Sequence, residues 1–181
     1  MRTQGLAFLT NIFFGTKGNA AYGISSNLST QTSNLTNALS ASINPEIIQS
    51  VGRGDKLNAI KLSFQSAKII LLLTIPIITE INYVLNLWLT IVPENAEILC
   101  ILMIFVFMIE KTTLTHMTLL QAINKISMPQ LIQGVIFSSS IIVAFIMIKL
   151  GFGIVSIGWS IIITMIISRI NLIYWVRKYL Y

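Results

Sequence analysis

Four long apolar runs limit what this chain can fold into. They cover residues 62–90, 96–123, 130–150 and 152–176. Each run is longer than an ordinary β-strand, and a membrane-spanning helix needs about 20 apolar residues. Isoleucine is frequent in all four, but in lipid a helix satisfies its own backbone hydrogen bonds, whereas an open strand does not. The sequence therefore predicts an all-α integral membrane protein in which these runs are helices.

Composition agrees with this class and excludes others. Apolar residues make up 55% of the 181 residues and charged residues only 10%, against about 25% in a soluble domain. The net charge is +6, but the lysines and arginines form no dense patch, so we expect no nucleic-acid partner. The single cysteine, Cys100, allows no intramolecular disulfide and no cysteine cluster for zinc. We expect no metal and no cofactor.

Residues 19–44 differ from the apolar runs because they are polar without being charged. From Ser25 to Asn44, fourteen of twenty residues are Ser, Thr, Asn or Gln. An apolar stripe nevertheless follows one side of a helical wheel, formed by Ala21, Ile24, Leu28, Leu35 and Leu39. As a helix this segment extends about 39 Å, which is enough to cross a bilayer.

We interpret this segment as a crossing helix that packs through its stripe and lines a water-filled path with its wide polar face. Unpaired amides and hydroxyls facing lipid would be costly, which favours water on that face. The residues expected along the path are Asn19, Tyr22, Ser26, Asn27, Thr30, Asn34 and Asn37. The alternatives are polar packing between helices and a linker or surface helix outside the membrane.

The positions of lysine and arginine predict the topology. They cluster after the polar helix, at Arg53 to Lys61, occur at Lys125, and return at Arg177-Lys178, whereas residues 91–95 and 150–152 contain none. This alternation follows the positive-inside rule and places both chain ends in the cytoplasm. We expect a single membrane domain over residues 1–181, with helices at about 5–15, 19–44, 62–90, 96–123, 128–150 and 152–177, the first of them truncated.

Three ionisable residues lie inside the run 96–123: Glu110, Lys111 and His116. A charged side chain at such a depth costs roughly 2.5–3.5 kcal/mol to insert, so it usually faces a cavity or a partner. Glu110 and Lys111 are about 100° apart on a helical wheel, so they do not pair face to face. The functional interpretation is a proton-relay carboxylate at Glu110 and anion-attracting cations at Lys111 and His116. The alternative is local neutralisation at a polar contact between helices.

Glu80 follows Pro76 by four residues in the run 62–90. Proline inside a helix frees a carbonyl and can kink the helix. A carboxylate beside such a kink is a candidate for ion coupling in a transporter. The alternative is a simple carboxylate at the membrane interface.

Short motifs follow one another along essentially the whole chain. They are Gln4-Gly5, Asn11-Ile-Phe-Phe-Gly15, Asn19-Ala-Ala-Tyr-Gly23-Ile24, Ile43-Asn-Pro45-Glu-Ile47, Gly54-Asp55, Tyr83-Val-Leu-Asn-Leu-Trp88-Leu, Val92-Pro93-Glu94 and Gln121-Ala-Ile-Asn124-Lys125. In this order and spacing the chain resembles the C-terminal half of bacterial polysaccharide and lipopolysaccharide (O-antigen type) exporters of the multidrug/oligosaccharidyl-lipid/polysaccharide (MOP) flippase superfamily.

The resemblance implies one six-helix lobe of a two-lobed, MATE-like transporter in the bacterial inner membrane. The complete protein would flip an undecaprenyl-pyrophosphate-linked oligosaccharide during polysaccharide or lipopolysaccharide biosynthesis, without enzyme activity. Its partners would be the lipid-linked oligosaccharide, membrane lipids and the missing N-terminal lobe or a second copy. The family often has arginine where this chain has Tyr22, and Lys17 is then the nearest anion-attracting residue.

Two other functions stay open at this point. A cation-coupled drug or metabolite antiporter of the same fold would use Glu110 or Glu80 as its carboxylate. A non-transporting membrane fragment is the other, because half of a transporter cannot enclose a path between two lobes.

Overall fold

The computed structural model describes residues 2–180, with the side chains of this range except those at 39, 40, 56, 112–116, 118, 119 and 180. The described chain forms α1 (Arg2–Gly52), α2 (Lys56–Thr79), α3 (Ile81–Trp88), α4 (Ala96–Ala122), α5 (Ser127–Lys149) and α6 (Val155–Leu180). No strand occurs in residues 2–180, which confirms the all-α prediction.

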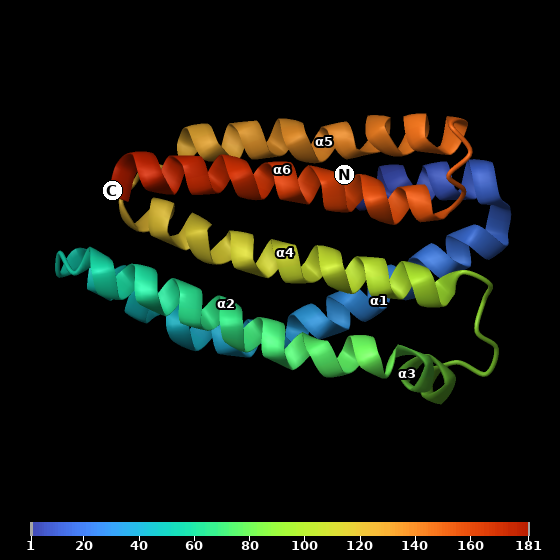
Figure 1. Cartoon of the computed structure of the whole chain (residues 1–181), viewed down its shortest axis with the longest axis horizontal. Coiled ribbons are helices and arrows are strands. Elements are labelled where there is room, and N and C mark those ends of the chain that lie inside the picture. Colours follow the sequence, from blue (N-terminus) through green and yellow to red (C-terminus); the bar gives the residue numbers. More distant parts are fainter. Residues whose placement is uncertain (1, 181) are drawn as a thin grey trace.

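The long helices lie side by side in one elongated bundle (Figure 1). The central helix, α4, packs against α1, α2 and α6, while α5 packs mainly on α6. The α1–α2 turn at Arg53, the α4–α5 turn at Lys125 and the C-terminus share one end of the bundle, which we call the basic end (Figure 1). The opposite end, formed by the kink of α1 and the loops 89–95 and 150–154, we call the loop end.

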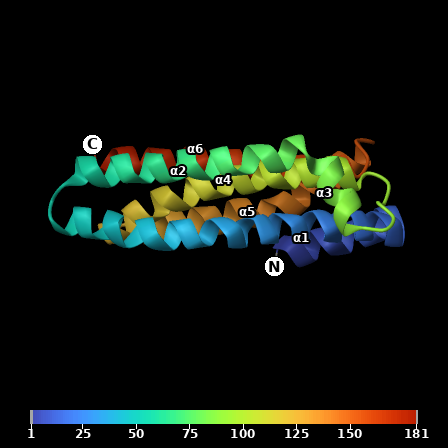
Figure 2. The same ribbon diagram turned by 90° about the horizontal axis from the view of Figure 1, so that it is seen from below.

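A kink at Gly15 divides α1 into two helical parts. Gly15 has φ 64° and ψ −161°, a backbone conformation that is essentially restricted to glycine. We call residues 2–14 the arm and residues 16–52 the long limb. The arm folds back beside the long limb (Figure 2), and the Tyr22 hydroxyl donates a 3.4 Å hydrogen bond to the Thr3 carbonyl. The expected helices 5–15 and 19–44 are thus joined by a kink rather than by a loop.

The polar helix is longer than expected. We expected it to end at residue 44, but α1 continues through Pro45 to Gly52 because Ile47 is buried against Ala59 of α2, with Ile43 and Val51 beside them. The N-terminal end of the chain lies part-way along the bundle, between its two ends (Figures 1 and 2), since the arm, as a helix, extends only about 20 Å from the loop end.

Three of the described helices are long and apolar enough to cross a membrane: Leu57–Thr79, Ser127–Lys149 and Val155–Tyr179. Their outward side chains are apolar, as at Leu72, Ile142 and Ile170, which suits contact with acyl chains. This agrees with the prediction of a membrane protein, while the expected spans 19–44 and 96–123 stay predictions.

The interior of the bundle is close-packed where α4 meets α6. A Cβ atom added at Gly158 would lie only 2.6 Å from Leu102 Cδ1, so glycine permits this approach. Leu99, Met103, Ile157 and Ile161 extend the same buried cluster along both helices. This packing holds α4 in place and so fixes the depth of the charged residues in its middle.

Candidate functional site

A shallow groove follows the polar side of α1, between the arm and the long limb. Its volume is about 400 Å³, and it is lined by Thr3, Gln4, Ala7, Asn19, Tyr22, Gly23, Ser26, Asn27 and Thr30. Five of the seven residues expected along a hydrated path therefore lie in one groove. Thr3 and Gln4 belong to the arm. The kink at Gly15 brings the arm back beside the long limb, so that the arm forms the second wall of the groove.

The polar face can stay open because the buried hydroxyls on the opposite side of the long limb form hydrogen bonds within their own helix. The hydroxyls of Ser25 and Thr32 are buried and donate to the carbonyls of Tyr22 and Leu28 in the same helix, at 2.8 and 2.9 Å. Ala21 and Leu28 are buried on the same seam. Leu35, expected on the apolar stripe, is 72% exposed, because the buried seam turns toward Thr32 and Thr36 instead.

The remaining two path residues lie farther along the long limb, beyond the groove. Asn34 is exposed and donates a 3.4 Å hydrogen bond to Gln31 Oε1. Asn37 accepts a 2.6 Å hydrogen bond from the Lys111 ammonium of α4. The long limb thus exposes amide side chains over more than four turns. Asn37, the last of the expected path residues, connects this polar face to the Lys111 ammonium inside the bundle.

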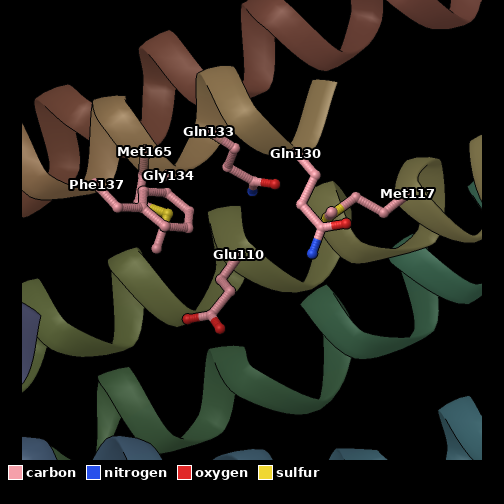
Figure 3. Close-up of a pocket in the computed structure, with 7 residues that line it drawn as sticks. All are labelled: Glu110, Met117, Gln130, Gln133, Gly134, Phe137 and Met165. Carbon is pink, nitrogen blue, oxygen red and sulfur yellow. The ribbon is translucent and has the colours of Figure 1, made fainter. Parts of the chain in front are cut away.

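Lys111 is buried, with 5% of its surface exposed, and its ammonium lies 5.4 Å from the centroid of the Phe107 ring. Its neighbour Glu110 lies on a different side of α4, as expected from the wheel. Glu110 lines a pocket of about 320 Å³ with Met117, Gln130, Gln133, Gly134, Phe137 and Met165 (Figure 3). The two ionisable groups therefore face separate surroundings.

Arg2 was not among the expected site residues. Its guanidinium carbon lies 5.1 Å from the centroid of the Phe137 ring, and its charge interacts with that of Glu110. Its Nη1 atom is buried without a hydrogen-bond partner. The arm length could have revealed this position, because thirteen helical residues counted back from the loop end reach about 20 Å into the bundle.

The other expected site residues do not join these two places. Lys17 is exposed in a hollow of about 450 Å³ at the loop end, where Glu94, Asn95 and Phe152 also lie. Glu80 is exposed at the break between α2 and α3, and its amide donates to the Pro76 carbonyl. The side chain of His116 lies outside the described residues. Among the described residues no three His, Cys, Asp or Glu side chains gather as a metal site.

The arrangement suits recognition of a neutral polar ligand on the α1 face with charged groups behind it. The amides and hydroxyls in the groove offer donors and acceptors without net charge. Arg2, Glu110 and Lys111 lie at mid-length, where charges in a membrane bundle usually serve function. Comparison with family models, curated proteins and solved structures finds no match to this chain.

Proposed function

We propose that the chain forms one half of an alternating-access transporter in the bacterial inner membrane. With a second lobe it would flip an undecaprenyl-pyrophosphate-linked oligosaccharide, and its basic end, which includes the C-terminus, would lie on the cytoplasmic side. One observation carries the proposal: a long helix keeps an uncharged polar face open on a bundle in which three other helices are long and apolar enough to cross a membrane. Such a face needs water or a polar ligand beside it.

The chemistry of the groove supports a carbohydrate ligand. Sugar hydroxyls both donate and accept hydrogen bonds, as do the side chains of Asn27, Thr30 and Gln4 on the groove. Lys111 and Arg2 would attract the pyrophosphate from behind this face, while the lipid chain remains in the bilayer. The movement would be a rocking of two lobes about the hydrated path, with no covalent step.

A cation-coupled antiporter is the second candidate, favoured by Glu110. Glu110 lines the mid-length pocket, and no described side chain donates a hydrogen bond to its carboxylate. In that case ion binding at Glu110 would drive export of a smaller substrate.

Cysteine accessibility tests whether the polar face is wet. In a Cys100→Ala background, we expect Asn27→Cys, Thr30→Cys and Asn34→Cys to react with a charged maleimide in membranes. Leu72→Cys and Ile142→Cys are matched controls because these side chains are also exposed, at 67% and 63%, but on apolar helix faces. They should stay unlabelled, since a thiol in acyl chains does not ionise. Equal labelling of all five positions, or none at Asn27, would contradict a hydrated path.

Complementation separates the two candidate functions. The chain joined to the N-terminal lobe of an O-antigen-type exporter should restore surface polysaccharide in a strain that lacks its flippase, and the chain alone should not. Restored drug resistance without polysaccharide would instead favour the antiporter. Full activity of the chain alone, as a monomer, would refute the half-transporter proposal.

A further inference from the structure

Two lysines from different parts of the chain lie against one aromatic ring at the basic end. Lys125 belongs to the turn after α4 and Lys178 to the last turn of α6, and these segments share one end of the bundle (Figure 1). The ammonium nitrogen of each lysine lies 5.9 Å from the centroid of the Tyr179 ring. The two nitrogens therefore cannot be farther apart than twice that distance, and it is the packing of the helices that gathers the two charges.

The Tyr179 ring is held in place by its neighbours. It stacks on Trp175, with centroids 5.5 Å apart and an interplanar angle of 20°. The indole Nε1 of Trp175 donates a 3.1 Å hydrogen bond to Asn171 Oδ1. Both rings pack on a buried cluster that includes Leu120 of α4 and Leu172 of α6. The ring is thus a fixed surface against which the two ammonium groups are positioned.

The two ammonium groups remain able to bind an anion. Both lysines are exposed, and an ammonium beside an aromatic ring keeps N–H groups free to donate. All six Asp and Glu side chains of the sequence belong to the described part of the chain, and there none of them forms an ion pair with Lys125 or Lys178. Neighbouring like charges repel each other, so an anion bound between them relieves the repulsion.

The depth of this cluster matches that of lipid headgroups. Tyr179 is the last residue of the membrane-length segment Val155–Tyr179, and Lys125 lies just before the membrane-length helix α5. Beside it the outward side chains of α5 become apolar, with Met128 61% and Leu131 67% exposed. Tyrosine and tryptophan are also enriched where a membrane meets water. The anion present at this depth is the phosphate of a lipid headgroup.

We propose that Lys125 and Lys178 bind the phosphate of one anionic phospholipid of the cytoplasmic leaflet, beside the Tyr179 ring. Their ammonium groups donate hydrogen bonds to its phosphate oxygens, and its acyl chains lie along the apolar outward side of α5. An anionic lipid is selected over a zwitterionic one because no described carboxylate stands beside the lysines to pair with a headgroup cation. Basic sites between helices bind anionic headgroups on this side of a membrane. Only the choice of leaflet rests on the proposed function, which places the basic end in the cytoplasm.

Quenching of a single tryptophan measures this binding. In a Trp88→Phe, Trp159→Phe background, Trp175 is the only tryptophan left, and its ring centroid lies 4.8 Å from the Lys178 ammonium. The protein is reconstituted in phosphatidylcholine vesicles with increasing mole fractions of brominated phosphatidylglycerol. Brominated phosphatidylcholine is the zwitterionic control. Bromine quenches an indole only at short range, so the signal reports lipid at this site.

We expect phosphatidylglycerol to reach half-maximal quenching at a lower mole fraction than phosphatidylcholine. Lys125→Gln and Lys178→Gln should each raise that mole fraction by about fivefold at most, in line with the attraction of one lysine to an anionic surface, and the double variant should show no preference. Lys61→Gln with Lys68→Gln is the matched control, because it removes the same charge from two exposed lysines of α2. It should keep the preference. Equal quenching by the two lipids, or equal losses in the two double variants, would overturn the inference.

Two further arms test the ring and the source of the phosphate. Tyr179→Phe keeps the ring and should bind like the parent, whereas Tyr179→Leu should lose part of the preference. Parent-like binding by Tyr179→Leu would overturn the role of the ring. Free glycerol phosphate should not reverse the quenching, and reversal would assign the site to a soluble phosphate instead of a lipid. Unchanged circular dichroism shows that each variant is still folded.

The two proposals fail in different ways. If Asn27→Cys on the polar face reacts and phosphatidylglycerol is not preferred, the lipid site falls and the transport proposal remains. If phosphatidylglycerol is preferred but Asn27→Cys does not react, the lipid site stands without a hydrated path.

Discussion

Lys111 places an ammonium inside the bundle against a neutral partner. Its Nζ lies 2.6 Å from Asn37 Oδ1, and no described carboxylate forms an ion pair with it. The two residues are 74 positions apart in the chain and connect α4 to the long limb. A hydrogen bond to a charged group contributes roughly 1.5–3 kcal/mol, so this contact ties the polar face to the centre of the bundle.

Removing the two partners should have unequal effects on stability. Asn37→Ala leaves a buried ammonium unpaired, and we expect it to lower the free energy of unfolding by roughly 1.5–3 kcal/mol. Lys111→Met removes the charge while keeping the length of the side chain, and should cost less. Asn34→Ala is the control, because Asn34 is exposed and bonds only within its helix; it should stay within about 0.5 kcal/mol of wild type. Unfolding in detergent, followed by circular dichroism, measures the stability of all three variants. An equal loss of stability in Asn34→Ala and Asn37→Ala would show that the Asn37–Lys111 hydrogen bond does not stabilise the bundle.

At the scale of the element, the kink of α1 decides what the polar helix faces. With φ 64° and ψ −161°, Gly15 turns the arm back so that Thr3 and Gln4 border the groove. A residue with a Cβ is strained in this conformation by about 1–3 kcal/mol. The break at Glu80 is different in kind: it follows Pro76 by one turn, and the Glu80 amide still bonds to the Pro76 carbonyl at 3.1 Å.

Two glycine-to-alanine changes isolate this backbone effect. An added Cβ meets nothing within 4 Å at either Gly15 or Gly23, so crowding differs at neither site. We expect Gly15→Ala to lower the free energy of unfolding by about 1–3 kcal/mol. Gly23→Ala, inside the helix, should be neutral or should stabilise the protein by up to about 1 kcal/mol. Thermal unfolding of the two variants provides the comparison, and an equal response would mean that the kink is not strained.

At the scale of the whole molecule, the bundle has two chemically different ends. Arg53, Lys125 and Arg177 belong to the basic end, whereas Glu94 lies at the loop end beside Lys17. Lys149 also lies at the loop end, so the difference is an excess of lysines and arginines at the basic end. Such an excess orients membrane proteins, with the positive loops in the cytoplasm.

A topology experiment follows from this asymmetry. A fluorescent protein fused after Tyr181 should fluoresce, because it would fold in the cytoplasm. In the Cys100→Ala background, Glu94→Cys should react with an impermeant maleimide added to intact cells. The same reagent should reach a cysteine introduced at Arg53 only after lysis. The opposite pattern would reverse the orientation proposed for the bundle.

The helices in the apolar runs could be predicted from the sequence because run length and hydropathy are local properties, but the run 62–90, expected as one helix, forms α2 and α3 with a break at Glu80. The polarity of residues 19–44 is likewise a property of the segment alone, and it led to five residues that line one groove. The end of α1 at Gly52 could not be predicted from the sequence, since the continuation of the helix past Pro45 depends on the packing of Ile47 against Ala59 in another helix.

Sequence alone determined that this is an all-helical chain with membrane-length apolar helices and an uncharged polar segment at residues 19–44. Only the tertiary structure decided which polar groups meet. Arg2 comes close enough to Glu110 for their charges to interact because the kink at Gly15 turns the arm back into the bundle, and Asn37 bonds to Lys111 because α4 packs across the long limb. Hydrophobic period and length act within a segment, whereas these pairings depend on the direction of each helix after its turn and on its register against its neighbours.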